Sequence, residues 1–425
     1  MTAAELDVEL NIESIAAGGD GVGRSNGVVV FVPRTAPGDR VRATIDVQRR
    51  FARGEIDALV RPSPDRVTPE CAHYVADKCG GCQLQHVNYD AQLEAKRRII
   101  RDSLARIGRR TVELPAIEPS PRRWRYRRKL TLTMRRVGNV DDWTIGLRAY
   151  DDPDRIFSLK DCPITDERVL SVWKDVAAAR RLLPDADELR GAVQLAGEEI
   201  SVMVRGGHAW PVRSEFFEAV PAATTLWWQP THRARNLVAS RRTAGDGGGD
   251  ASASFAQVNT EVGAALHQYV LELARTYRPA SVVDAYSGAG GTALSLAGDG
   301  ALVVAIEADR DAAAVCGERL APFAGSRSLA ARVEDVIEQS LPADVVLLNP
   351  PRVGVHERVT AAIAHSTPAP RAVIYVSCDP ATLARDVARL PGFRIASLRA
   401  FDMFPQTAHV ETVCELVPDP QGQNA

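Results

Sequence analysis

The strongest constraint on the fold lies in the C-terminal part of the chain, where short apolar runs alternate with stretches of helical periodicity. The apolar runs cover 281–285, 301–306, 343–348 and 372–376. Runs of this length between helical stretches are typical of buried strands rather than core helices. Strands that alternate with helices indicate a doubly wound α/β domain with a parallel sheet, which we expect to span residues 251–425.

A glycine-rich loop follows the first of these strands. It reads Asp-Ala-Tyr-Ser-Gly-Ala-Gly-Gly-Thr over 284–292 and precedes a helical run over 293–297. Glycines let the backbone approach a ligand where Cβ atoms would clash, and Glu307, at the end of the next strand, can hold a ribose diol. This order of strand, loop, helix, strand and acid fits two cofactors, a dinucleotide and S-adenosylmethionine.

Three further segments place reactive side chains at the ends of strands. Asn349-Pro-Pro-Arg352 follows one strand and can form a stiff lip that grips a planar base. Cys378 follows another and precedes a helix, a position that lowers the pKa of a thiol. If 408–416 is a strand, His409 and Glu411 share a face, and the acid can remove a proton in the crevice that holds Cys378.

The first 60 residues predict a small β-barrel of the oligonucleotide-binding type, because short β-rich runs are separated by glycine and proline turns. The glycine-rich stretch at 18–23 is interpreted as a tight turn, since a strand and not a helix follows it. Downstream, residues 90–136 hold 15 Lys and Arg against 5 Asp and Glu. Arginines interleaved with Trp124 and Tyr126 suit phosphate contact and base stacking.

Seven cysteines raise the question of metal binding. An odd number in a chain without a signal peptide argues against a disulfide framework. Cys71, Cys79 and Cys82 are closely spaced around two glycines, and Cys162 is the candidate fourth ligand. Four soft ligands suit an iron–sulfur cluster and zinc equally well, so the spacing leaves both open.

The remaining composition excludes several protein classes. The chain is 45% hydrophobic and 25% charged, as expected for a globular protein rather than a disordered one. It has no run of 18 apolar residues and an acidic N-terminus, so we expect neither a membrane span nor a secretory signal, and a cytoplasmic location. Residues 91–107 predict a helix, 122–240 predict a strand-rich domain, and the glycine-rich segment 244–253 is interpreted as a flexible boundary.

Together these motifs resemble the RNA 5-methyluridine methyltransferases, the family that methylates uracil C5 in transfer and ribosomal RNA. The resemblance covers nearly the whole chain. The N-terminal residues resemble the family's TRAM domain, and Phe-Ala-Gln-Val-Asn at 255–259 resembles its FxQVN motif. The two longest matches are VSCDPATLARD at 376–386 and DMFPQTAHVE at 402–411.

The resemblance implies an activity and roles for individual residues. Cys378 is the implied nucleophile, which adds to C6 of uracil, and Glu411 is the implied base. The implied cofactors are S-adenosylmethionine and a [4Fe-4S] cluster, and the implied partner is RNA, with 23S ribosomal RNA favoured over transfer RNA. The other implied roles are cofactor contacts by Gln257, Tyr286, Gly288, Gly291, Glu307 and Asn349, RNA contacts by Phe255, Arg127 and Arg352, and cluster ligation by Cys71, Cys79, Cys82 and Cys162.

The resemblance also implies a domain division: a TRAM-like barrel over 1–60, a central domain with the cysteines over 61–250, and a Rossmann-like methyltransferase domain over 251–425. The helix near 91–110 is expected to pack with the last of these, and the protein is expected to be a monomer. Asn349 departs from the Asp that the family usually has. This departure keeps an exocyclic-amine methyltransferase open as an alternative. A transfer RNA enzyme and a non-catalytic RNA-binding protein also stay open.

Overall fold

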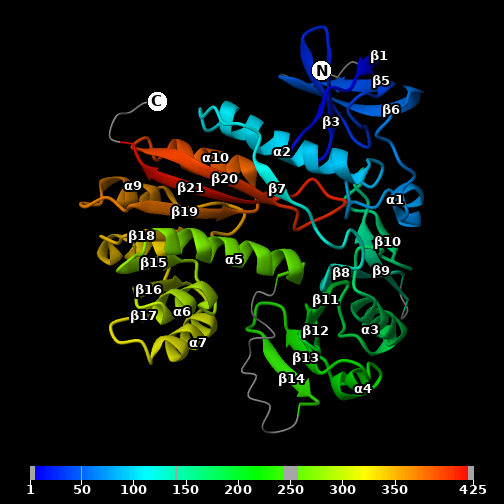
Figure 1. Cartoon of the computed structure of the whole chain (residues 1–425). Coiled ribbons are helices and arrows are strands. Elements are labelled where there is room, and N and C mark those ends of the chain that lie inside the picture. Colours follow the sequence, from blue (N-terminus) through cyan, green and yellow to red (C-terminus); the bar gives the residue numbers. More distant parts are fainter. Residues whose placement is uncertain (1–4, 49, 139–141, 243–256, 420–425) are drawn as a thin grey trace.

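The computed structural model describes residues 5–48, 50–138, 142–242 and 257–419, so the expected boundary at 244–253 and Phe255 lie outside the described residues. Three β-sheets follow one another along the chain and form three units (Figure 1). The N-terminal sheet lies at one end of the molecule, and the central and C-terminal sheets lie beside each other below it (Figure 1).

The N-terminal unit is a six-stranded sheet with the order β1-β5-β6-β4-β3-β2, which confirms the expected small β domain. Its core is a cluster of β-branched and aliphatic side chains that includes Val30, Val32 and Ile45. The glycine-rich stretch at 18–23 leads into strand β3, as expected for a turn and not for a phosphate loop. The strands are β1 Glu5–Asn11, β2 Ser14–Ile15, β3 Gly21–Ser25, β4 Val28–Val32, β5 Arg40–Val47 and β6 Phe51–Arg61.

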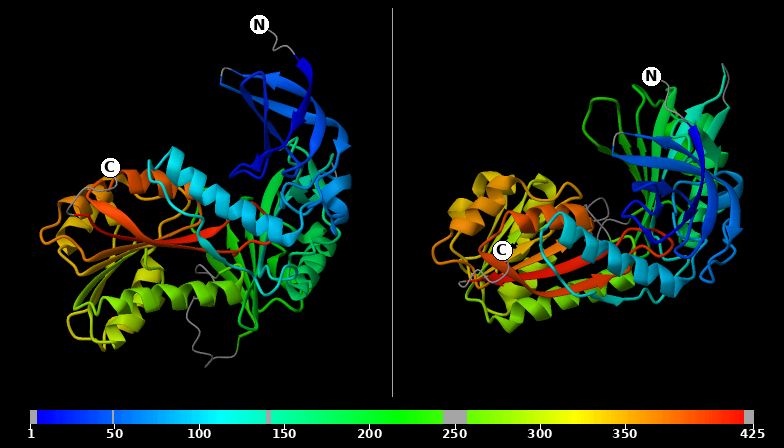
Figure 2. Two further views of the ribbon diagram at one scale, coloured as in Figure 1. Left: turned by 45° about the horizontal axis from the view of Figure 1, so that its top comes forward. Right: turned by 90° about the horizontal axis from the view of Figure 1, so that it is seen from above.

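Two helices connect this sheet to the rest of the chain: α1 (Ala72–Ala76) and α2 (Tyr89–Arg106). Asn88 caps α2 by accepting a hydrogen bond from the Ala91 amide. The buried face of α2 packs against helix α10 of the C-terminal unit through Ile100 and Leu104. From above, α2 runs from the N-terminal sheet across the C-terminal one (Figure 2). No described helix is both long enough and apolar enough to cross a membrane.

The central unit is a seven-stranded sheet with the order β10-β9-β8-β11-β12-β13-β14. Helices α3 and α4 cover one face, where Trp173 and Phe216 are buried against the strands. Its strands are β8 Lys129–Arg136, β9 Trp143–Arg148, β10 Ile156–Ser158, β11 Glu188–Ala196, β12 Glu199–Arg205, β13 Thr225–Gln229 and β14 Asn236–Ser240. Its helices are α3 Glu167–Ala178, the 3-10 helix Arg180–Leu182 and α4 Arg213–Glu218.

The C-terminal unit is an eight-stranded α/β sheet with the order β17-β16-β15-β18-β19-β21-β20-β7. Its strands are β15 Ser281–Ala285, β16 Leu302–Glu307, β17 Arg327–Ala330, β18 Val345–Leu348, β19 Ala372–Ser377, β20 Phe393–Phe401 and β21 Glu411–Pro418, with β7 Ala116–Glu118 from much earlier in the chain. Its helices are α5 Thr260–Thr276, α6 Gly291–Gly298, α7 Arg310–Leu320, α8 Val333–Val336, the 3-10 helix Glu338–Ser340, α9 Glu357–His365 and α10 Pro380–Ala388.

The C-terminal sheet differs from the expected all-parallel one in two ways. Strand β21 runs antiparallel to both β19 and β20, because β20 and β21 follow one another without a crossover helix. Strand β7 adds to the far edge, parallel to β20. The described part of the α/β unit therefore includes a segment that precedes the central sheet in the sequence.

Candidate active site and cysteine cavity

The candidate site lies where the order of the C-terminal sheet reverses. Strand β15 has β16 on one side and β18 on the other, so the loops after β15 and β18 diverge. Ligands of open α/β sheets bind in the crevice at the carboxyl ends of the strands on either side of such a switch point. The glycine-rich loop and Asn349 both follow these strands, and the Asn349 amide donates to the Ala285 carbonyl at 3.3 Å, so both lie at the edge of the sheet where the crevice is expected.

The glycine-rich loop is built for a close backbone approach. Tyr286, Gly288 and Gly290 all have positive φ, and a Cβ at Gly290 would lie 2.4 Å from the Cys316 sulfur. The Glu307 carboxylate accepts a hydrogen bond from the Gly288 amide at 2.9 Å, so the acid and the loop are in contact. Together they form a cradle with an acid at its side, which fits the adenosyl cofactor expected there.

Beneath this cradle, Asp284 is a buried acid with an unused acceptor. Burial raises its pKa from 3.8 to about 7, and the nearby Glu307 adds to the rise. Its Oδ2 has no hydrogen-bond partner. An unpaired buried polar atom is costly, so this acid is available to a donor on a ligand or on the loop.

The loop after β18 is anchored by a helix behind it. Gly354 has a φ of 77°, and a Cβ there would lie 2.4 Å from the Asp386 carboxylate. Asp386, which is fully buried on α10, accepts hydrogen bonds from the Val355 amide and the Tyr375 hydroxyl. Asn349 and Arg352 at the start of this loop are exposed. The anchored loop thus presents an amide and a guanidinium at the crevice.

Cys378 lies directly after β19 and directly before α10. Asp379 caps α10 through the Ala381 and Thr382 amides at 2.9 Å, and Pro380 occupies the first turn. The capped helix fixes the position of the thiol, which is only partly buried and therefore accessible.

Glu411 begins β21, the strand that pairs with β19. The antiparallel register pairs Ser377 with Thr412, so its continuation by one residue puts Cys378 opposite Glu411. Residues directly opposite in an antiparallel pair have Cα atoms about 4.5–5.5 Å apart. The strand begins at Glu411 and not at 408, so His409 lies in the preceding loop, with its ring beside Phe404. The sheet thus brings the expected nucleophile and the expected base together.

The charges around this pair contradict one sequence expectation. A helix N-terminus was expected to lower the pKa of Cys378, but burial raises it, and the Glu411 charge raises it further, while Arg352 partly offsets the rise. Burial also raises the pKa of Glu411 from 4.5 to about 7, again with Arg352 opposing. The local sequence around Cys378 contains the helix but not the acid, which comes from 33 residues later in the chain.

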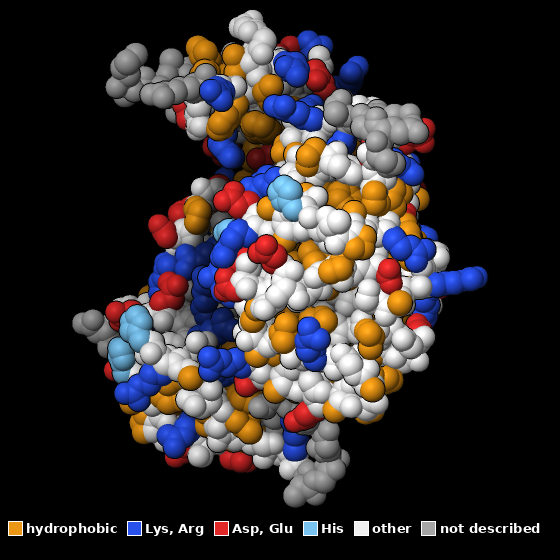
Figure 3. All heavy atoms as spheres, turned by 90° about the vertical axis from the view of Figure 1, so that its left-hand side faces the viewer, with side chains coloured by type: hydrophobic (Ala, Val, Ile, Leu, Met, Phe, Trp, Pro, Cys, Tyr) orange, Lys and Arg blue, Asp and Glu red, His pale blue; other side chains and the backbone are white. Residues whose placement is uncertain are grey.

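The residues expected to contact RNA lie in different parts of the structure. The charge of Arg352 lowers the pKa values of both Cys378 and Glu411, against the rise due to burial. Arg127 lies beside the four cysteines, where it lines the same cavity, and its Nε donates a hydrogen bond to the Lys129 carbonyl at 2.9 Å. Gln257 packs against Gly263 at the start of α5, and Phe255 lies outside the described residues. The face on the left of Figure 1 has a hollow in which Lys and Arg side chains gather (Figure 3).

The structure brings the four expected cysteine ligands to one small cavity of about 40 Å³. Cys71, Cys79 and Cys82 come from the segment around α1, and Cys162 comes from the loop that follows β10. All four are free thiols. Burial raises the pKa of Cys79 to about 11 and that of Cys82 to about 12. Such thiols stay protonated at neutral pH until a cation takes the place of the proton.

The chemistry of this donor set fits a soft metal centre, since it consists of four sulfur atoms around one cavity. Within the described ranges, no three His, Cys, Asp or Glu side chains form a group that could hold a single metal ion as they stand. The cavity is therefore a candidate metal centre by virtue of its four sulfur ligands.

Sequence reasoning missed the buried polar residues that hold these loops. Asp386 anchors the loop after β18, and Lys96 and Tyr89 of α2 contact Asp402. One signal was present: Lys96 lies on the apolar face of the predicted helix, one turn from Ile99 and Ile100, where a solvated lysine is not expected. The partner of such a lysine, 306 residues away, could not be read from the local sequence.

Comparison with known families gives two matches. Residues 315–417 match the model of the tRNA (Uracil-5-)-methyltransferases, and residues 5–56 match the TRAM domain. The first match includes Cys378 and Glu411, and the second covers the N-terminal sheet.

Full-length relatives support the same grouping. An uncharacterized RNA methyltransferase of Thermosynechococcus vestitus is 34% identical, over 96% of this chain and 97% of the relative. Another, of Halalkalibacterium halodurans, is 32% identical over 96% of each chain. Among solved structures, the Pyrococcus abyssi tRNA (uracil-54, C5)-methyltransferase in complex with S-adenosyl-L-homocysteine aligns with a TM-score of 0.67 and 23% identity, over 96% of this chain and 100% of that one. This last likeness shows that the two chains share a fold.

Proposed function

The chain belongs to the RNA methyltransferases of the uracil-5 family, and from that membership we propose that it methylates C5 of a uracil in RNA through a covalent bond between Cys378 and C6. The observation that carries the proposal is the pairing of β19 with β21, which sets Cys378 opposite Glu411. A nucleophile and a base on adjacent strands can act on neighbouring atoms of one planar ring.

The residue types fit the demands of this reaction. Uracil C5 is a poor nucleophile, and addition of the Cys378 thiolate at C6 makes it an enolate carbon that can attack a methyl group. S-adenosylmethionine supplies that methyl group as an electrophile. Glu411 then takes the C5 proton, the electrons of the C5–H bond reform the C5–C6 double bond, and Cys378 leaves as the thiolate. Arg352 balances negative charge on both groups.

We also propose a [4Fe-4S] cluster held by Cys71, Cys79, Cys82 and Cys162. Four sulfur donors around one cavity support it. These cysteines join α1 to the central sheet, so the cluster would fix the segment that follows the N-terminal barrel. No catalytic step passes through it.

For the substrate, we propose 23S ribosomal RNA, bound by the barrel of residues 1–60, the central domain of residues 61–250 and the methyltransferase domain of residues 251–425, in a monomer. We assign α2 to the last of these, because α2 packs on α10. Transfer RNA is the second candidate, favoured by the description of the matched family and by the substrate of the Pyrococcus abyssi enzyme. A target base stacked in folded RNA has to be flipped out to reach Cys378.

The test incubates anaerobically purified protein and S-adenosylmethionine with unmodified ribosomal RNA or transfer RNA in separate reactions. Digestion to nucleosides and mass spectrometry then measure 5-methyluridine. We expect it in the ribosomal reaction with the wild-type protein and in neither reaction with Cys378→Ala. 5-Methyluridine in the transfer RNA reaction alone would move the proposal to transfer RNA. A methylated exocyclic amine that survives Cys378→Ala would overturn the covalent mechanism and assign Asn349 the central role.

A further inference from the structure

The segment that delivers Glu411 to the site is an irregular loop. The 402–409 loop connects the end of β20 to the start of β21 and has neither helical nor strand hydrogen bonding. Its middle residue, Gln406, has a φ of 70°, a conformation that non-glycine residues rarely adopt. An irregular loop with a strained residue keeps one conformation only if its surroundings hold it.

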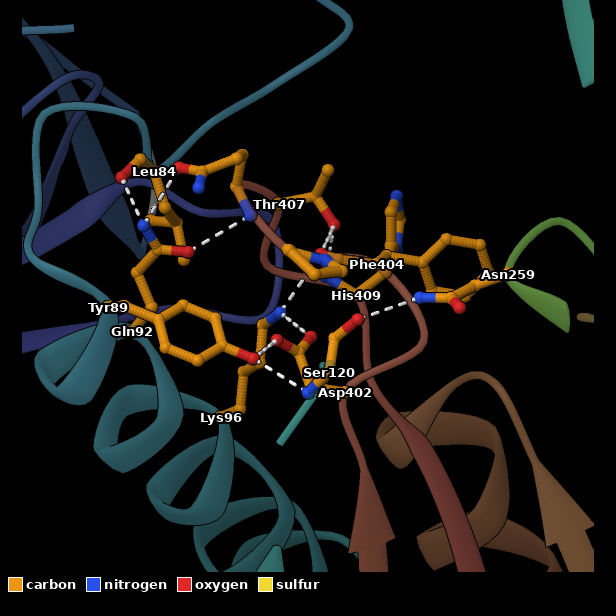
Figure 4. Close-up of polar contacts among 12 residues, drawn as sticks. Leu84, Tyr89, Gln92, Lys96, Ser120, Asn259, Asp402, Phe404, Thr407 and His409 are labelled. Atoms are coloured by element: carbon orange, nitrogen blue, oxygen red, sulfur yellow. Dashed lines mark hydrogen bonds and ion pairs between the residues drawn. The ribbon is translucent and has the colours of Figure 1, made fainter. Parts of the chain in front are cut away.

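Helix α2 supplies the side chains that hold this loop. Lys96 Nζ donates to Asp402 Oδ1 at 2.5 Å and to the Phe404 carbonyl at 3.0 Å. The Tyr89 hydroxyl donates to Asp402 Oδ2 at 2.7 Å. Gln92 Nε2 donates to Gln406 Oε1 at 3.0 Å, and the backbone amide of Gln406 donates to Gln92 Oε1 at 3.0 Å. Figure 4 shows these side chains converging from α2 on the loop.

The same cluster reaches the segment expected to contact the cofactor. The Tyr89 hydroxyl accepts a hydrogen bond from the Ser120 amide at 2.8 Å. The Ser120 hydroxyl in turn accepts one from Asn259 Nδ2 at 2.9 Å (Figure 4). Asn259 caps α5 and lies two residues after Gln257. One chain of hydrogen bonds thus links the loop before the base to the segment before α5.

The cost of this cluster argues that it does more than stabilise the fold. The side chains of Lys96 and Asp402 are both 0% exposed. Removing two charges from water costs about as much as their attraction returns, and apolar residues of similar volume often stabilise a core better. What an ion pair with directional hydrogen bonds adds is a single defined geometry. Here that geometry belongs to the loop that ends at Glu411.

We propose that Lys96 and Tyr89 are positioning residues for the reaction: through Asp402 they hold the 402–409 loop so that Glu411 stands where it can take the C5 proton. This inference rests on the proposed function. It predicts that weakening the cluster slows proton removal from C5 while leaving the addition of Cys378 and the binding of both substrates intact.

The first test uses Tyr89→Phe, which removes one hydroxyl and leaves the Lys96–Asp402 pair in place. We expect kcat to fall about tenfold, with KM for RNA and for S-adenosylmethionine within about twofold of wild type. On RNA that carries deuterium at uridine C5, the isotope effect on kcat should increase, because C5 deprotonation has become slower. RNA with 5-fluorouridine has no C5 proton to lose, so the rate at which it forms the covalent protein–RNA complex should match wild type.

The matched control is Tyr277→Phe, which removes a hydroxyl that donates to the Glu415 carboxylate in the same unit. It should leave kcat, the isotope effect and the trapping rate unchanged. The proposal is overturned if Tyr89→Phe turns over like wild type, or if trapping and turnover fall equally. If the wild-type protein methylates neither RNA, the proposed function itself has failed, and this inference falls with it.

A second pair of variants separates positioning from stability. Lys96→Met alone leaves the buried Asp402 charge without its ion-pair partner and should lower the melting temperature strongly. Lys96→Met combined with Asp402→Leu leaves no buried charge and should restore the melting temperature. We expect kcat of this double variant to stay about a hundredfold below wild type. Recovery of kcat together with stability would show that the pair has a structural role alone.

Discussion

Cysteine thiols occur in two regions of the molecule that differ in their surroundings. In the crevice, a single partly buried thiol, Cys378, lies beside an acid and a guanidinium. In the cavity beside α1, four thiols are mainly surrounded by one another and by apolar side chains such as Ile164. Burial raises the thiol pKa in both places. His73, Asp161 and Arg127 also line the cavity, where four thiols face one another, whereas in the crevice one thiol lies beside one acid and one guanidinium.

The two regions differ in what favours the loss of the thiol proton. In the cavity, the proposed cluster would take the place of the thiol protons, and thiolates held in this way would be unavailable as nucleophiles. In the crevice, burial and the Glu411 charge oppose the ionisation of Cys378, and Arg352 favours it. The four predictions below test this contrast.

The largest expected effect is that of Cys378→Ala. Loss of the nucleophile should reduce methylation by at least about 10⁴-fold, because Cys378 is the group proposed to add to C6. Binding of S-adenosylmethionine, measured by calorimetry, should persist. Cys414→Ala removes a fully buried thiol from β21 and serves as the control: it should lower the melting temperature but leave methylation within about twofold.

Next in size is the loss of one thiol from the cavity. Cys162→Ser should reduce iron and acid-labile sulfide from about four per chain to less than one. The melting temperature should fall by about 5–10 °C, because metal binding contributes to folding. Cys316→Ala, in the glycine-loop region, should leave the iron content unchanged. One zinc per chain and no iron in the wild-type protein would show that the cavity is a zinc site.

The pH dependence follows from Glu411. Its pKa of about 7 means that the carboxyl is protonated at pH 6 and cannot accept the C5 proton. Cys378, whose pKa is raised, must also lose its proton, so activity should rise about a hundredfold per pH unit below about pH 7 and about tenfold per unit above it, up to the pKa of Cys378. In Glu411→Gln the change of slope near pH 7 should disappear. A profile with its maximum on the acid side would contradict the assignment of Glu411 as base.

The smallest effect is expected for Arg352→Ala. The guanidinium lowers the pKa values of both Cys378 and Glu411, so its loss should move the activity profile toward higher pH. Near neutral pH, activity should fall about three- to tenfold, with partial recovery as the pH rises. Arg310→Ala, at the start of α7, is the control and should not move the profile. An unchanged profile in Arg352→Ala would show that Arg352 acts only on the RNA.

Much of the fold could be predicted because its signals are local. The apolar runs found the strands at 281–285 and 372–377, and the periodicity of 91–107 found α2. A strand near 408–416 was considered, but its antiparallel direction and the added β7 were missed, because strand order depends on packing between distant segments and not on the residues of the strand itself.

The candidate site shows the same limit. Cys378 and Glu411 were found from long motifs, and the four cysteines from their spacing. The direction of the Cys378 pKa shift was wrong, because the helix behind the thiol is local, whereas the burial that raises the pKa most and the acid that raises it further both come from tertiary packing. Lys96 was overlooked for a related reason. Its role depends on an ion pair with Asp402, which is distant in the sequence and cannot be identified from the residues around Lys96.

The placement of α2 has a consequence for the order in which this protein can be made. Residues 89–118 leave the ribosome long before α10 and β20, the elements on which they pack. Until those elements are synthesised, the apolar side of α2 has no partner within its own unit, whereas the N-terminal barrel and the central sheet can each close earlier. A fragment that begins at residue 251 would lack the helix that covers β20 and α10. The methyltransferase unit thus has its first segment synthesised early, and it can fold completely only after its last strand has been synthesised.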